Sequence, residues 1–326
     1  MSDKARRRVG LIGIVFSIII VLGVFAYMIN TAQKVPSAGG QKPFTLFPAA
    51  SPTLPPITCK TPAHTAGGDT TEKITSGGLQ RTFLVHLAPS YGRQPQPLVI
   101  SYHGYSWTSK IMENSTQMDS TANKYGFVLV YPQGVDDPPS WNAGVGALGP
   151  TGDADDVQFT RDMLTSLEKN YCINTQRVYV TGISLGAGMA YRVACALSTR
   201  ITAIATVSGA YYPFGACNAT RPMASLELHG LADTLAPYAG NADRRMAAVQ
   251  DYLNVWLKID QCSGNSTQFF QKGDVTGIEW THCAAGTIVR HYRISDGAHT
   301  WPGQPGTTHV ISANEVIWSF FSKFSL

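Results

Sequence analysis

The chain has 326 residues, of which 44% are hydrophobic and 14% are charged, and its formal net charge is +4. This composition is typical of a folded protein with a large core and excludes global disorder. Part of the positive charge lies in the first eight residues, and no basic stripe continues along the chain, so nucleic acid is excluded as a predicted partner.

The N-terminal segment predicts a membrane anchor. A basic tail, residues 1–8, precedes an uncharged and mostly apolar run at residues 9–29. A helix of that length, at about 1.5 Å per residue, crosses a bilayer core of about 30 Å. The run is long for a cleaved signal and lacks a clean cleavage site before Gln33, so we expect an uncleaved signal anchor with a cytosolic N-terminus. Cleavage and secretion are the alternative, and both make the remaining chain extracytoplasmic.

Residues 30–58 form a predicted linker, because they carry six prolines and only two charges, Lys34 and Lys42. From residue 59 to residue 326 we expect a single domain. Apolar runs predict strands at 81–88, 98–102, 127–131, 201–207, 223–228 and 288–294. Helices are expected at 115–125, 153–170, 187–197 and 243–259, and a last helix begins at Ser312, which forms a capping-box pattern with Glu315. This alternation predicts an α/β fold with a mostly parallel sheet flanked by helices.

One stretch, Val178 to Ala190, indicates a nucleophile. A β-branched and aromatic run passes through Gly182-Ile183-Ser184-Leu185-Gly186 into a segment of helical periodicity. A serine on a tight strand-to-helix turn is exposed above the sheet, and its neighbours at two residues' distance must be small. The sequence therefore predicts Ser184 as a catalytic nucleophile; a glycine-rich turn that only packs is the alternative.

A serine needs a histidine base and a buried carboxylate, and on this fold they follow the serine in the order acid, then histidine. His299 lies in a loop between the last predicted strand and the last helix, so it is the expected base. Asp233, just after an earlier strand, is preferred as the acid over Asp296, which is expected to shape the His299 loop. Of the other histidines after Ser184, we expect structural support from His229 and a surface or packing role for His291.

The oxyanion formed during ester cleavage requires two backbone N–H donors. One is expected from Leu185, directly after the nucleophile, and the other from Tyr105, in the loop after His103-Gly104. The sequence predicts no cofactor and no metal site, since it contains no Cys-x-x-Cys or His-x-x-x-His spacing.

The motifs taken together resemble the feruloyl esterase and acetylxylan esterase family, which is grouped with poly(3-hydroxybutyrate) depolymerases and has the α/β-hydrolase fold. The resemblance covers about residues 59–326. It is carried by 100–104, 155–157, 171–174, 181–191, 229–234 and 299–303. It implies Ser184, Asp233 and His299 as the triad. Many relatives have Cys at the position of Tyr105, which puts the shape of the pocket in doubt.

Six cysteines allow fifteen pairings, and the sequence itself does not select one. The resemblance implies Cys59 with Cys172, Cys195 with Cys217, and Cys262 with Cys283. Asn-x-Ser/Thr sequons make glycosylation possible at Asn114, Asn218 and Asn265.

Aromatic residues in predicted loops are candidates for binding a phenolic ring or sugars, with gap filling as the alternative: Tyr105, Trp107, Trp141, Tyr211, Tyr212 and Tyr238. The resemblance implies a feruloyl esterase acting on hydroxycinnamoyl esters of plant polysaccharide, with acetylxylan esterase or polyhydroxybutyrate depolymerase as alternatives. A membrane-tethered binding protein on an inactive hydrolase scaffold is the hypothesis from another class. The sequence does not indicate an oligomeric state.

Overall fold

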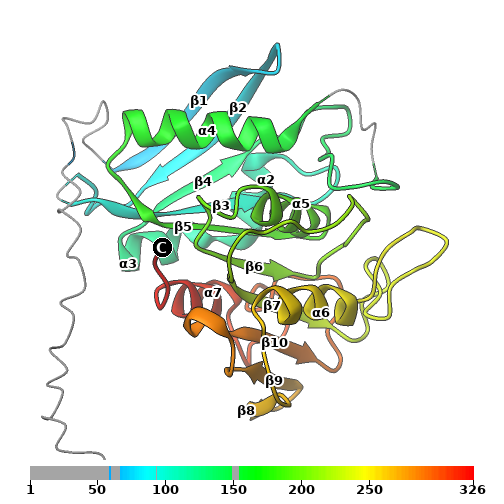
Figure 1. Cartoon of the computed structure of the whole chain (residues 1–326). Helices are drawn as coiled ribbons and strands as arrows, with labels where there is room; N and C mark the ends of the chain where they lie inside the picture. Colours follow the sequence, from blue (N-terminus) through cyan, green and yellow to red (C-terminus); the bar gives the residue numbers. More distant parts are fainter. Residues whose placement is uncertain (1–58, 60–66, 93, 149–153) are drawn as a thin grey trace, which may run out of the picture. The chain divides into compact units, whose positions relative to one another are not determined.

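The computed structural model describes residue 59 and residues 67–92, 94–148 and 154–326 (Figure 1). The predicted basic tail, signal anchor and linker lie outside the described residues. Within the described ranges, no helix has both the length and the hydropathy that a bilayer crossing requires.

Ten strands in the described part form one sheet, in the order β1-β2-β4-β3-β5-β6-β7-β10-β9-β8. Their bounds are β1 Gly68–Ser76, β2 Leu79–Leu87, β3 Gln96–Tyr102, β4 Val128–Pro132, β5 Ile173–Ile183, β6 Ala203–Val207, β7 Ala224–Gly230, β8 Thr267–Lys272, β9 Val275–Trp280 and β10 Val289–Ile294.

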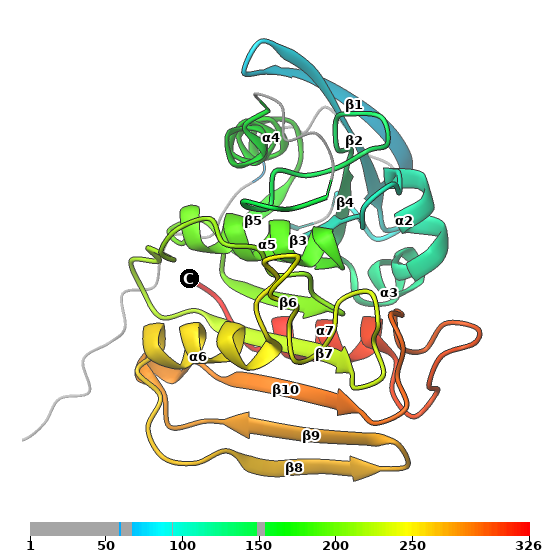
Figure 2. The same cartoon turned by 90° about the vertical axis from the view of Figure 1, so that its right-hand side faces the viewer.

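The middle of the sheet is parallel and its margins are antiparallel. Strands β4, β3, β5, β6, β7 and β10 run in one direction, whereas β1, β2, β8 and β9 add to the two sides by antiparallel pairing. The hairpin of β8 and β9 is visible at one side of the sheet (Figure 2). The predicted α/β-hydrolase fold with a mostly parallel sheet is found, but β1, β8 and β9 were not among the predicted strands.

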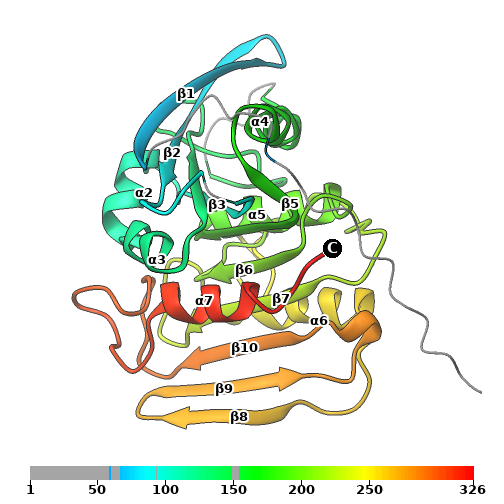
Figure 3. The same ribbon diagram turned by 90° about the vertical axis from the view of Figure 1, so that its left-hand side faces the viewer.

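Helices cover both faces of the sheet (Figures 1 and 3). Residues of α4 (Asp156–Asn170), α5 (Leu185–Ala196) and α6 (Val249–Ile259) join one buried cluster. Residues of α2 (Ser109–Thr116), α3 (Met118–Tyr125) and α7 (Ala313–Phe321) join the other. Successive side chains of a strand point to opposite faces. Accordingly, Ile100 packs in the first cluster and its neighbour Val99 in the second.

Three helix predictions need correction. The expected helix 115–125 is two helices, because Gln117 adopts φ +50° and ends α2 before α3 begins. The expected helix 243–259 begins only at Val249, since Asn241 and Met246 exchange two backbone hydrogen bonds and hold the preceding residues in a turn. The predicted capping box at Ser312 is wrong: the Ser312 side chain makes no capping bond, and Glu315 instead accepts hydrogen bonds from Tyr125 and Lys124 of α3.

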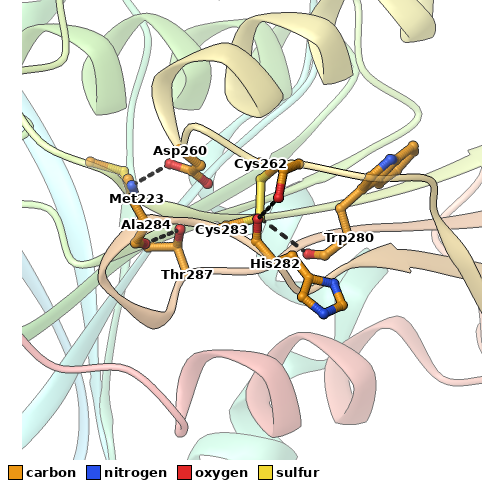
Figure 4. Close-up of a disulfide and its surroundings, with 9 residues drawn as sticks. Met223, Asp260, Cys262, Trp280, His282, Cys283, Ala284 and Thr287 are labelled. Carbon is orange, nitrogen blue, oxygen red and sulfur yellow. Dashed lines mark hydrogen bonds between the residues drawn. A yellow bond between two sulfur atoms is a disulfide. The ribbon is translucent and has the colours of Figure 1, made fainter. Parts of the chain in front are cut away.

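Three disulfides join Cys59 to Cys172, Cys195 to Cys217 and Cys262 to Cys283, the pairs that the resemblance implies. The third connects the segment after α6 with the loop after β9 (Figure 4). Disulfides persist in oxidising compartments, so this framework supports an extracytoplasmic location for the described domain.

Candidate active site

Ser184 lies on the turn between β5 and α5 in a backbone conformation that few non-glycine residues adopt, with φ +58° and ψ −125°. The turn is held from two sides: the Ser184 N–H donates to Val207 O of β6, and its carbonyl accepts from Ala210 N–H. The side chain is half-buried and lines a cleft. These features are those of a nucleophile elbow, as the sequence predicts.

The glycines around the serine permit this turn because other backbone segments pass through the space of a side chain. A Cβ on Gly186 would overlap the carbonyl oxygens of Tyr102 and His103, and a Cβ on Gly182 would come within 2.8 Å of the Tyr102 oxygen. Contacts of that length do not occur with real side chains. The Gly-x-Ser-x-Gly spacing is therefore a steric requirement of this fold.

The loop after β3 is fixed by the buried His103. Its Nε2 accepts the Gly134 N–H at 2.9 Å, so the proton resides on Nδ1, which donates to Gly104 O at 2.8 Å. Burial lowers the pKa of His103 to about 4, which keeps the ring neutral and preserves this tautomer. The carbonyl of His103 also accepts a hydrogen bond from the Trp141 indole at 2.9 Å.

This fixed loop brings Tyr105 into the cleft that Ser184 and Leu185 line. Neither the Tyr105 N–H nor the Leu185 N–H has a hydrogen-bond acceptor among the described residues. Leu185 is also the first residue of α5, where the helix N-terminus favours negative charge. Both N–H groups are thus available to an oxyanion beside Ser184.

Asp233 and His299 come together from loops after β7 and β10. Asp233 Oδ2 lies 2.8 Å from His299 Nδ1, and Asp233 Oδ1 accepts the N–H groups of Leu235 and Ala236 at 2.9 and 2.8 Å. The Asp233 side chain is fully buried and that of His299 is 15% exposed, which leaves the imidazole accessible from the cleft. The rival acid, Asp296, is exposed and makes no contact with His299 among the described interactions.

The loops that carry the acid and the base are joined by their backbones. Leu231 and Ala232 donate to Ile294 O and Gly297 O, and Gly230 approaches Gly297 so closely that neither position has room for a side chain. Ser208, after β6, donates to Thr300 O at 3.1 Å. The positions of Asp233 and His299 therefore depend on each other.

Ser184 and His299 line one cavity of about 330 Å³, together with Tyr105, Trp107, Leu185 and Tyr212. In the described part of the chain no hydrogen bond joins the Ser184 hydroxyl to the imidazole. In an unliganded site this contact is often long and shortens when substrate binds. The three predicted triad residues thus lie at one edge of the sheet, at the carboxyl ends of β5, β7 and β10.

The candidate aromatics divide into two groups. Trp107 and Tyr212 line the cleft, as does Tyr105. Trp141 does not: it is buried in the core, where its ring meets Tyr102 and His103. Tyr211 is also buried, stacked on Tyr252, and Tyr238 bonds to His291. The prediction of substrate contact is corrected for Trp141 and Tyr211, because burial removes their rings from the cleft, whereas for the half-buried Tyr238 it stays a prediction.

The structure adds cleft residues that the sequence did not indicate, namely Leu148, Leu235 and Arg244. Leu235 is 59% exposed, two residues after the acid, and a single leucine in a loop gives no signal that could have identified it. The predicted sequon residues Asn114, Asn218 and Asn265 are all exposed, which is compatible with glycosylation; that modification stays a prediction.

Residues 81–271 match the family described as Esterase PHB depolymerase. The chain belongs to this family. The resemblance to this family that the sequence motifs indicate is thereby confirmed. The feruloyl esterase D of Neurospora crassa is 26% identical over 294 residues, covering 86% of this chain and 94% of that protein.

The match covers only part of two further relatives. The feruloyl esterase B of Piromyces equi is 26% identical and the bifunctional acetylxylan esterase/xylanase of Neocallimastix patriciarum is 25% identical, over 72% and 73% of this chain. The match spans only 43% and 33% of those proteins, respectively.

Solved structures share the fold. The acetyl xylan esterase from Aspergillus awamori superposes with a TM-score of 0.58 at 13% identity, over 78% of this chain and 99% of that one. The feruloyl esterase module from Clostridium thermocellum superposes with a TM-score of 0.52 at 12% identity, over 83% and 93% of the two chains. These likenesses establish the α/β-hydrolase-like fold.

Proposed function

We propose that this Esterase PHB depolymerase family member is an extracytoplasmic serine esterase that cleaves hydroxycinnamoyl esters, as a feruloyl esterase does, from plant cell-wall polysaccharide. The observation that carries this proposal is that Ser184 and His299 line one cleft, with the buried Asp233 2.8 Å from the far ring nitrogen of His299. Chemically, this set supplies a nucleophile, a base and an orienting carboxylate.

In the proposed mechanism, His299 Nε2 removes the proton from the Ser184 hydroxyl while its oxygen attacks the ester carbonyl carbon. Asp233 accepts the His299 Nδ1–H, holds the ring orientation and stabilises the imidazolium. The N–H groups of Leu185 and Tyr105 stabilise the negative oxygen. His299 then protonates the leaving alcohol, and the acyl-enzyme is hydrolysed by water that His299 activates.

The cleft favours an aromatic acyl group over acetate. Its volume of about 330 Å³ exceeds what an acetyl group fills, and the rings of Trp107, Tyr105 and Tyr212 border it. Flat aromatic rings stack on such side chains. Relatives named feruloyl esterase support this choice. Acetylxylan and hydroxybutyrate oligomers are the alternative substrates.

We further propose that residues 9–29 anchor the enzyme to the membrane.

Replacement of Ser184 tests the mechanism. We expect Ser184→Ala to abolish hydrolysis of methyl ferulate and p-nitrophenyl acetate with an unchanged melting temperature, whereas Ser319→Ala, on the exposed face of α7, retains full activity. Near-full activity of Ser184→Ala would refute the mechanism.

Turnover of methyl ferulate, acetylated xylan and hydroxybutyrate oligomers then ranks the substrates. A fluorophosphonate probe distinguishes an enzyme from an inactive binding scaffold, because the scaffold would not be labelled at Ser184.

A further inference from the structure

A buried ionic pair lies behind the acid of the triad. Glu227 and His229 are alternate residues of β7, so both side chains point to the same face of the sheet, and both are 0% exposed. Their Oε1 and Nδ1 atoms are 2.8 Å apart. The other ring nitrogen of His229, Nε2, lies 2.8 Å from Ala236 O and 3.5 Å from Asp233 Oδ2. The mechanism above uses neither residue.

Both nitrogens of His229 face oxygen atoms that only accept hydrogen bonds. A neutral imidazole has one N–H, whereas the imidazolium has two, so the surroundings select the cation. Burial by itself would lower the pKa of His229, but the attraction and hydrogen bond of Glu227, together with Ala236 O and Asp233, raise that pKa. Conversely, attraction by His229 and His291 overcomes the effect of burial on Glu227 and lowers the pKa of that carboxyl.

A second strand supports the pair. His291 of β10 lies beside Glu227 in the parallel register, and its Nδ1 is 2.7 Å from Glu227 Oε2. The Tyr238 hydroxyl is 2.9 Å from His291 Nε2. Burying an ion pair costs desolvation free energy, so a gain in fold stability is a weak explanation for the presence of these charged groups. A functional role would explain why they lie behind Asp233.

We propose that Glu227 and His229 are positioning residues for the triad: the pair holds a cation against Asp233 and thereby sets both the position of the acid and the ionisation of His299. This proposal rests on the proposed function. Asp233 Oδ2 is shared by two imidazoles, those of His229 and His299. A cation at His229 and an imidazolium at His299 would repel each other across the Asp233 carboxylate.

Several other titratable or charged groups surround these atoms. They are Tyr211 after β6, 3.5 Å from Glu227 Oε1; Tyr252 of α6; His291 and Arg293 of β10; Tyr238; and Arg244, which lines the cleft with His299. Apart from His299 itself, His229 is the cation-forming group that contacts Asp233 in the described structure.

The experiment compares full-length wild type with His229→Gln, Glu227→Gln and the double variant, with His282→Gln at an exposed position as matched control. The ionisation of His299 is measured by NMR titration of its imidazole and by the acid limb of kcat/KM for methyl ferulate. We expect the pKa of His299 to rise on the order of one unit in both single variants. We also expect kcat to fall about 10- to 100-fold with little change in KM.

Because the two residues act as one unit, the double variant is expected to lose no more activity than the worse single variant. A purely structural role predicts lower melting temperatures with an unshifted His299 titration, and that result would overturn the inference. If the wild type hydrolyses no ester, the proposed function fails, while the NMR titration still decides whether His229 sets the ionisation of His299.

Discussion

The two halves of the candidate site are fixed by different physical means. On the β3–β5 side, the serine and the oxyanion N–H groups are held by backbone: a positive φ at Ser184, glycines without room for a Cβ, and a neutral His103 that bonds main-chain atoms. On the β7–β10 side, backbone contacts also join the loops, but the acid and base are oriented in addition by contacts between ionisable side chains. Substitutions that add atoms should therefore disrupt the β3–β5 half by steric overlap. Activity that depends on the β7–β10 half should respond to changes of charge and pH.

The largest expected effect concerns the charged half. Asp233→Asn should lower kcat/KM about 10³- to 10⁴-fold at neutral pH, because the amide no longer holds the His299 tautomer or stabilises its cation. Steady-state kinetics with methyl ferulate measures this loss. The isosteric variant should keep a melting temperature close to wild type, and an activity loss below tenfold would show that another carboxylate orients His299.

The β3–β5 half, which backbone contacts hold, is tested by adding one methyl group at Gly186. Gly186→Ala should destabilise the protein by about 3 kcal/mol or more, since its Cβ overlaps two carbonyl oxygens. Gly215→Ala serves as a comparison: unlike Gly186, Gly215 has a φ of +94°, which is unusual for alanine, but no atom lies within 4 Å of the new Cβ, so about 1 kcal/mol is expected. Chemical denaturation gives both values. Equal losses would mean that overlap of the Cβ with the two carbonyl oxygens does not explain the need for glycine at position 186.

The pH dependence of the free energy of unfolding tests the β7–β10 half further, because Asp260 binds the residue that precedes β7. Asp260 accepts the N–H of Met223, the residue before β7 (Figure 4). The backbone carbonyl of Asp260 accepts the N–H of Ala284. Burial raises the pKa of Asp260 from 3.8 to about 7. Between these values the folded state holds a proton that the unfolded state has lost, so this residue's contribution to stability falls as pH rises from about 4 to 7.

Asp260→Asn keeps an acceptor for Met223 but does not titrate. Relative to wild type, the variant should therefore gain stability as pH rises over that range, by up to about 4 kcal/mol. Urea denaturation at several pH values measures the difference. Parallel stability curves for the two proteins would show that Asp260 ionises normally in the fold.

The smallest expected effect lies in the cleft between the halves. Trp107→Ala should raise KM for methyl ferulate about fivefold through lost stacking and leave p-nitrophenyl acetate hydrolysis nearly unchanged. Kinetics on the two esters gives the ratio, and Trp280→Ala, on β9 and outside the cleft lining, serves as control. Equal losses on both esters would exclude Trp107 as the determinant of acyl preference.

The same division explains what the sequence could reveal. The elbow was predictable because backbone sterics restrict the residue types at Gly182, Ser184 and Gly186. The acid and base followed from chain order and loop position. The contact of Glu227 with His291 was not predictable, because it depends on a register between β7 and β10 that local patterns do not encode. Trp141 was misjudged for a related reason: a ring in a loop looks the same in sequence whether it faces the cleft or the core.

The antiparallel strands at the sides of the sheet show a second limit of prediction from sequence. Strand β8 is mostly exposed, so it lacks the alternation of buried and exposed residues by which half-buried strands are identified. The end of α2 likewise depends on the left-handed conformation of one glutamine, a residue type with no special preference for it.

The bond between Cys59 and Cys172 determines how the domain would bear mechanical load. Cys172 directly precedes β5, the central strand that ends at the turn carrying Ser184. A pull on the chain at residue 59 would thus pass through a covalent link into the middle of the sheet, and the β1–β2 hairpin would not need to resist it. Reduction of this bond should redirect the force to that hairpin, whose strands can be unzipped one hydrogen bond at a time.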